Sequence, residues 1–240
     1  MKIFFLVSVF IIICASQSVY PQNYYEEYES AKLKLSGLKA QLNAEPENES
    51  LRVMVAEAYI NMNKQADAAQ VLKTGLLRNP ESFVLNFELC PIYLSINQPN
   101  KAIDHAKESI RIEPNNPQAY YNLGLAYGAM GLHNKAISTL KKTIQLDDKN
   151  PDYYFDLGVA YFSNSNYPLA MENYRKTLEL DPKDARAFVN IATIYNIQGE
   201  TEQAVNNLKK ALDIMGPYTP EGQKLMGFIQ AIQEEKLNKK

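Results

Sequence analysis

The feature that most constrains this chain is a series of tyrosines that recur every 34 residues: Tyr59, Tyr93, Tyr127, Tyr161 and Tyr195. A series of alanines has the same spacing: Ala68, Ala102, Ala136, Ala170 and Ala204. Tyrosine fills only 16 of 240 positions, so two series with one period indicate an internal repeat rather than chance. Their phase defines five units, at 49–82, 83–116, 117–150, 151–184 and 185–218.

Apolar residues inside each unit recur at helical spacing. In the third unit, Tyr120, Leu123 and Tyr127 share one helical face, and Ile137, Leu140 and Ile144 share a second. A short turn, GLHN, separates the two segments, and prolines near several unit ends cannot continue a helix. Each unit is therefore predicted to be an antiparallel pair of helices. A column of small residues would let the helices approach closely: Ala56, Cys90, Gly124, Gly158 and Ala192.

The order of residue types in YYNLGLAYGAMGLHNKAISTLKKTIQLDD and YYFDLGVAYFSNSNYPLAMENYRKTLELDP resembles the tetratricopeptide repeat. The resemblance implies an all-α fold, a right-handed superhelical solenoid of five 34-residue helix-turn-helix repeats with terminal capping helices. It also implies a concave face lined by the first helix of each unit. Arg52 and Asn86 replace the opening aromatic residue, which predicts a looser N-terminal part.

Both ends of the array are predicted to carry capping segments. Residues 219–240 begin with Thr219 as N-cap and Pro220 as first helical residue, and they continue as an amphipathic helix with a polar tail. Residues 19–48 are predicted to form a spacer and a capping helix or half repeat, because apolar residues step by three and four there: Ala31, Leu35, Leu38 and Leu42.

Residues 1–18 have the pattern of a secretory signal peptide. Lys2 precedes an apolar run over residues 3–13, which is too short for a transmembrane helix, and small and polar residues follow. We therefore expect export to the periplasm or cell envelope. Lipidation of Cys14 is the alternative, although Ile13 stands where bacterial lipoproteins have a small residue. In that case the protein would be a lipid-anchored outer-membrane assembly factor.

Composition and motifs argue against several classes of function. A net charge of −2 with well-mixed charges gives no basic surface for nucleic acid, and a membrane is expected as a partner only through Cys14. The two histidines, His105 and His133, lie in different units, are expected at exposed positions and form no metal motif. We expect no cofactor, no metal site and no enzyme activity. Cys90 belongs to the small-residue column, so it is predicted to pack rather than to react.

The predicted function is that of a non-catalytic scaffold or adaptor whose concave groove binds an apolar peptide or helix of a protein partner. The resemblance places these residues in the groove: Phe87, Leu94, Tyr121, Asn122, Leu125, Phe155, Val159, Phe162, Val189 and Asn190. It also implies that Asn122 and Asn190 can bind the backbone of an extended peptide, and that a lysine clamp for a terminal carboxylate is absent.

Two alternatives remain for this surface. The aromatic side chains could pack only against the next helix, or the protein could be a structural spacer that binds through its convex face or terminal helices. Pro91 lies inside the first helix of the second unit, where it removes the hydrogen bond to the carbonyl of Phe87 and predicts a kink.

Overall fold

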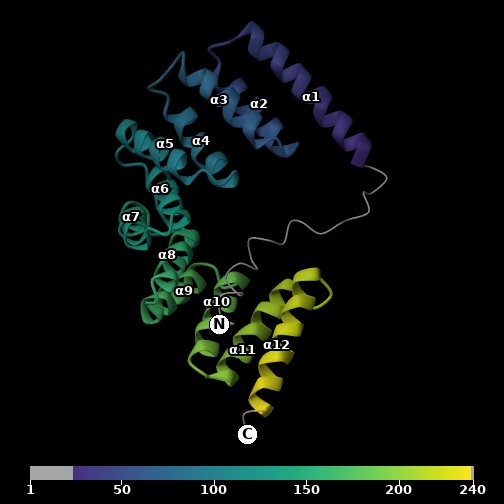
Figure 1. Cartoon of the computed structure of the whole chain (residues 1–240), viewed down its shortest axis with the longest axis vertical. Coiled ribbons are helices and arrows are strands. Elements are labelled where there is room, and N and C mark those ends of the chain that lie inside the picture. Colours follow the sequence, from purple (N-terminus) through teal and green to yellow (C-terminus); the bar gives the residue numbers. More distant parts are fainter. Residues whose placement is uncertain (1–23, 239–240) are drawn as a thin grey trace. The chain divides into compact units, whose positions relative to one another are not determined.

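The computed structural model describes residues 24–238, and all twelve secondary-structure elements in that range are α-helices (Figure 1). The prediction of an all-α chain is therefore confirmed for these residues. The predicted signal peptide and Cys14 lie outside them. The helices are α1 (Tyr24–Ala44), α2 (Glu49–Asn61), α3 (Gln65–Leu76), α4 (Phe83–Ser95), α5 (Pro99–Ile112), α6 (Pro117–Ala129), α7 (His133–Leu146), α8 (Pro151–Ser163), α9 (Tyr167–Leu180), α10 (Ala185–Ile197), α11 (Thr201–Met215) and α12 (Pro220–Asn238).

The chain forms two compact units, of which the first ends at Val71 and the second begins at Leu72. In the first unit, α1 packs on α2, and Leu35 and Leu38 of α1 share a buried cluster with Val55 and Ala58. In this way α1 covers the apolar side of the first repeat, as a capping helix does.

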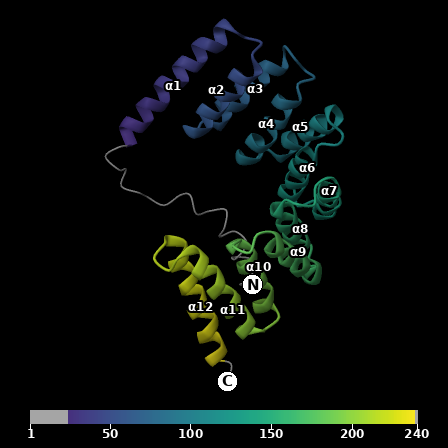
Figure 2. The ribbon, with the colours of Figure 1, turned by 180° about the vertical axis from the view of Figure 1, so that it is seen from behind.

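The second unit is a series of helical hairpins: α4 with α5, α6 with α7, α8 with α9, and α10 with α11. Each second helix also packs on the first helix of the next hairpin, and α12 packs on α11 (Figure 2). In addition, α4 contacts α6 and α6 contacts α8, so first helices of consecutive hairpins lie side by side.

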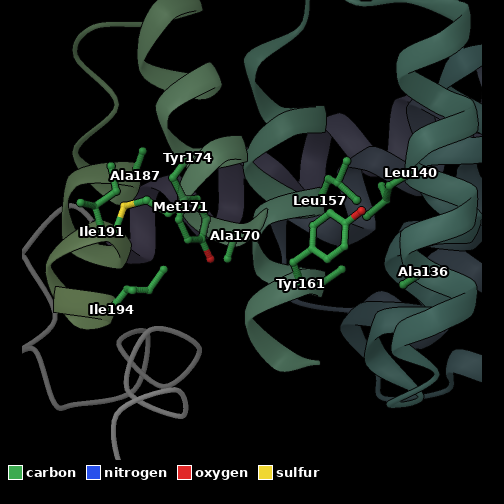
Figure 3. Packing of buried hydrophobic residues seen from close by; sticks show 11 residues of the cluster. Ala136, Leu140, Leu157, Tyr161, Ala170, Met171, Tyr174, Ala187, Ile191 and Ile194 are labelled. Atoms are coloured by element: carbon green, nitrogen blue, oxygen red, sulfur yellow. The ribbon is translucent and has the colours of Figure 1, made fainter. Parts of the chain in front are cut away.

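The alanine series lies at the closest part of each hairpin, where the exposed fraction of all five residues is 1% or less. One buried cluster runs through four helices. In it, Leu157 and Tyr161 of α8 lie between residues of α7 and residues of α9, and residues of α10 belong to the same cluster (Figure 3). The small-residue column matches the size of the facing side chain. A Cβ on Gly124 would lie 2.8 Å from Leu140, and a Cβ on Gly158 would lie 2.6 Å from the ring of the buried Tyr174.

Two further series with the same 34-residue period fix where helices begin and end. The first helix of each repeat has an N-cap residue whose side chain accepts a backbone N–H two or three residues on: Asn48, Ser82, Asn116, Asn150 and Asp184. The turn inside each repeat has one residue with positive φ: Asn63, Asn97, Gly131, Ser165 and Gly199. The N–H after each of these bonds to the carbonyl of the periodic tyrosine at 2.8–2.9 Å, which is a Schellman motif.

The structure corrects the prediction of a loose N-terminal part at Arg52 and Asn86. Both side chains are buried and hydrogen-bonded. Arg52 donates to the carbonyls of Val71 and Pro46, and Asn86 donates to the carbonyl of Ser82 and contacts Nδ1 of His105 at 2.8 Å. These bonds replace the packing of an aromatic ring. Because His105 and His133 are partly buried, the prediction that both histidines are exposed is also wrong.

Pro91 lies on the exposed side of α4, and the helix continues without interruption from Phe83 to Ser95. Since proline has no N–H, the carbonyl of Phe87 lacks its usual partner four residues on. A bend at this place stays a prediction.

The C-terminal helix α12 docks through a glycine contact. Thr219 caps the helix by accepting the N–H of Gly222 at 3.0 Å, as predicted for an N-cap. A Cβ on Gly222 would collide with the backbone carbonyl of Gly216, whose φ is 84°. Leu225, Ile229 and Ile232 then join a buried cluster with residues of α10 and α11.

Gly222→Ala should therefore destabilise the protein by about 1–3 kcal/mol, because a backbone atom cannot move aside as a flexible side chain can. Gly227→Ala is the matched control on the same helix: its Cβ would meet nothing within 4 Å, so helix propensity should stabilise it by about 0.5–1 kcal/mol. Urea unfolding followed by circular dichroism measures both. Equal effects of the two substitutions would contradict the close docking of α12.

Candidate partner-binding surface

The ten residues predicted to line the groove all lie on α4, α6, α8 and α10 of the second compact unit. Nine of them are partly buried, and Asn122 is buried at 9% exposure. We call this row of ten residues the first-helix surface. The larger apolar side chains of the row therefore pack against neighbours and still present part of their area to solvent.

Tyr121 links α6 to α8. Its hydroxyl donates a hydrogen bond to Oδ2 of Asp156 at 2.5 Å, and its ring packs on Tyr153 with ring centroids 4.9 Å apart. Asp156 follows directly after the predicted groove residue Phe155 but is not among the residues predicted to line the groove. Its position in the repeat, equivalent to Asn122 and Asn190, could have identified it.

Phe155 of α8 contacts side chains of both α9 and α10. The guanidinium of Arg186 lies 4.4 Å from its ring centroid, and the ring of Tyr174 lies 5.7 Å away. The same guanidinium pairs through Nη2 with Asp152 and with Asp184, each at 2.6 Å. Part of the Phe155 ring thus packs within the protein, as the alternative of packing against the next helix predicts. These contacts also hold the ring in one orientation.

The remaining aromatic residues of the row have neighbours of their own. Phe87 stacks on Phe83 at 5.4 Å, and Phe162 lies 5.4 Å from Tyr167. Asn122 is buried, and Asn190 is partly buried. The peptide-binding role that the resemblance implies for these asparagines stays a prediction.

Charge is distributed unequally between first and second helices of the hairpins. The first helices α4, α6, α8 and α10 contain no lysine, and their charged residues are Glu88, Asp152, Asp156 and Arg186. The second helices α5, α7, α9 and α11 carry most of the cations: Lys101, Lys107, Arg111, Lys135, Lys141, Lys142, Arg175, Lys176, Lys209 and Lys210. The first helices thus form the acidic, weakly charged side of the hairpins.

Burial raises the pKa of Asp156 to about 6, and the nearby carboxylates of Asp152 and Asp184 act in the same direction. The hydrogen bond from Tyr121 and the charge of Arg186 oppose the shift without cancelling it. Burial, followed by the charge of Asp156, raises the pKa of Tyr121 as well, so Tyr121 stays the hydrogen donor of the pair.

Cys90 is fully buried, and its thiol donates to the backbone carbonyl of Asn122 at 3.7 Å. Burial raises the pKa of this thiol to about 12, so the reactive thiolate is scarce at neutral pH. The thiol therefore serves as a packing group between two repeats.

Within residues 24–238, no group of three or more His, Cys, Asp and Glu side chains is arranged to bind a metal ion. Over that part of the chain, none of the helices is both long and apolar enough for a membrane span.

The raised pKa of Asp156 predicts a pH-dependent stability. Because the folded state holds the proton more tightly than the unfolded state does, the cost of the charged carboxylate is absent below about pH 4 and complete above about pH 6. Asp156→Asn, which keeps an acceptor for Tyr121, removes this cost. Its free energy of unfolding relative to that of the native protein should therefore rise by about 1–3 kcal/mol when the pH is raised from about 4.5 to about 7.5.

Urea unfolding at the two pH values measures this gain. Asp148→Asn, at an exposed carboxyl between α7 and α8, is the control and should show little change with pH. An Asp156→Asn effect that is the same at both pH values would contradict the burial of this carboxylate.

Comparison with known proteins identifies the repeats. Residues 117–150 and 151–184 match the family model described as Tetratricopeptide repeat, with the same bounds as the third and fourth predicted units. A further model of the same description matches residues 173–206, and one described as TPR repeat matches residues 92–131. No curated protein matches the chain.

Several solved structures are similar in fold. MamA is 28% identical, with a TM-score of 0.61 over 67% of this chain and 94% of that one. TTC0263, a thermophilic TPR protein in Thermus thermophilus, is 17% identical, with a TM-score of 0.63 over 77% of this chain and 98% of that one. YrrB, described as a TPR protein with an unusual peptide-binding site, is 18% identical, with a TM-score of 0.59 over 80% of this chain and 97% of that one.

Because TTC0263 and YrrB are only 17% and 18% identical to this chain, their similarity shows the fold alone. The repeat matches and the shared architecture together confirm the predicted fold class. The described chain is an all-helical solenoid that contains tetratricopeptide repeats.

Proposed function

We propose that this protein is a non-catalytic interaction scaffold in the bacterial cell envelope, and that its first-helix surface binds an apolar peptide or helix of a protein partner. The observation that carries the proposal is the row of partly buried aromatic and aliphatic side chains on four consecutive first helices. Such a row offers preformed apolar area at little cost in side-chain entropy, because packing already holds the rings in place.

Further apolar side chains extend the row at both ends. Val84 at the start of α4 is 43% exposed, and Ile197 at the end of α10 is 41% exposed. Exposed apolar side chains at helical spacing from the row add to the apolar area that a protein partner could cover. YrrB, which has the same fold and a peptide-binding site, is consistent with such a use.

The test is a partner isolated by affinity purification from the native cell envelope, followed by a binding titration with variants. Phe87→Ala combined with Phe155→Ala should weaken binding about tenfold or more. Because Phe155 also packs on Tyr174, Val84→Glu is a second variant that adds a charge at an exposed position and leaves the core intact. Circular dichroism must show unchanged helicity.

Leu132→Ala combined with Leu180→Ala is the control for this titration. The two leucines are 38% and 37% exposed and lie outside the first helices, so binding should not change. Unchanged binding in both surface variants would contradict the proposal. Loss of binding on deletion of 219–240, with the surface variants unaffected, would favour the spacer that binds through terminal helices.

The location in the envelope is part of the proposal and rests on the pattern of residues 1–18. Cleavage of this segment would release a soluble scaffold, whereas lipidation of Cys14 would give an anchored outer-membrane assembly factor. We expect cleavage without lipid, because Ile13 does not fit the lipoprotein pattern. Metabolic labelling with a fatty acid measures this directly: label that disappears in Cys14→Ser would establish the anchored form instead.

A further inference from the structure

Asp156 of α8, the residue directly after Phe155, is a carboxylate that adjoins the first-helix surface. Arg186 is the single cation of α4, α6, α8 and α10, and its guanidinium is already bonded to Asp152 and Asp184. Asp156, between these residues and Tyr121, forms no ion pair within residues 24–238, and its hydrogen bond from Tyr121 uses Oδ2. Oδ1 therefore keeps its capacity to accept, and the residue is only partly buried.

We propose that the partner segment held on the first-helix surface is apolar with one lysine or arginine, and that this cation pairs with the free oxygen of Asp156. The inference rests on the proposed function and names the chemistry of the partner. It commits to a cationic segment because of the charge of the surface: three carboxylates stand against one arginine on the four first helices, and lysine is absent there.

The alternatives to a cation are each unfavourable at this position. An uncharged apolar segment would remove the remaining water from Asp156 without supplying a hydrogen bond. Such desolvation of a carboxylate costs free energy. An acidic segment would be repelled by Glu88, Asp152 and Asp156. A lysine or arginine replaces the lost water with a charge-assisted hydrogen bond, and its aliphatic stem can lie on the neighbouring rings of Tyr121 and Phe155.

The geometry also makes the preference depend on pH. The ionisable groups that face Asp156 are Tyr121 from α6, Asp152 from its own helix, Tyr174 from α9, and Asp184 and Arg186 at the start of α10. Burial raises the pKa of Asp156 to about 6, while lysine and arginine stay charged throughout this range. As the pH falls through 6, the carboxylate is neutralised and its attraction for a cation is lost.

Three sets of immobilised synthetic peptides test the inference with the purified protein. Each peptide has about 12 residues, an apolar sequence randomised over Ala, Val, Leu and Phe, and a central position fixed as Lys, Gln or Glu; this length can lie across several repeats as an extended chain. At about pH 7.5 the Lys set should bind about tenfold more strongly than the Gln set, and the Glu set should bind most weakly. At about pH 5 the difference between Lys and Gln should largely disappear.

Asp156→Asn should bring the Lys set down to the level of the Gln set at both pH values. Glu179→Gln is the matched control, because Glu179 is a carboxylate on a second helix with a side chain 63% exposed, and it should keep the preference for lysine. A lysine preference that survives in Asp156→Asn, or that is absent in the native protein, would overturn the inference.

The same experiment separates this inference from the proposed function. If all three sets bind equally and Val84→Glu weakens them all, the first-helix surface binds apolar segments and only the requirement for a cation is wrong. If no set binds, or if Val84→Glu changes nothing, the proposed function fails and the inference fails with it.

Discussion

The structure depends on how closely the two helices of each hairpin approach. The periodic alanines have almost no exposed area because a facing helix covers each of them, and a larger side chain at these places would push the helix axes apart. Where the small-residue column is glycine, the facing residue is Leu140 or Tyr174. In the second repeat the column is Cys90, and Ala106 stands at the corresponding place of the second helix. The sizes of facing residues are thus matched within each repeat.

Close approach fixes the distance between helices, and the two series at the helix ends fix their register. An N-cap side chain starts every first helix at the same position of the repeat, and a residue with positive φ ends it. The periodic tyrosine supplies the carbonyl that closes the turn, so it has a backbone role besides its packing. Because all first helices share these ends, equivalent side chains fall into rows across consecutive repeats.

The first-helix surface is a consequence of these rows. Three of its aromatic side chains, Tyr121, Phe155 and Phe162, are partly buried because each also packs on a ring of a neighbouring helix, as Phe155 does on Tyr174. The same packing brings Asp156 next to Tyr121 and leaves Arg186 engaged with two other carboxylates. Apolar area and an unpaired carboxylate thus occur together on one side of the hairpins, and this combination underlies both the proposed scaffold function and the proposed preference for a cationic segment.

The sequence by itself determined the number of repeats, the helical hairpin and the terminal helices, because the 34-residue period and the helical spacing of apolar residues are local patterns. It also placed Cys90 in a packing position. It did not determine how Arg52 and Asn86 are accommodated, because their partners at Val71 and His105 lie 19 residues away along the chain. Tertiary structure alone decided the environment of Asp156, since Tyr121 is 35 residues distant and the charges around it come from neighbouring helices. A pattern along one chain segment fixes local geometry, whereas burial and charge at a site are sums over segments that only folding brings together.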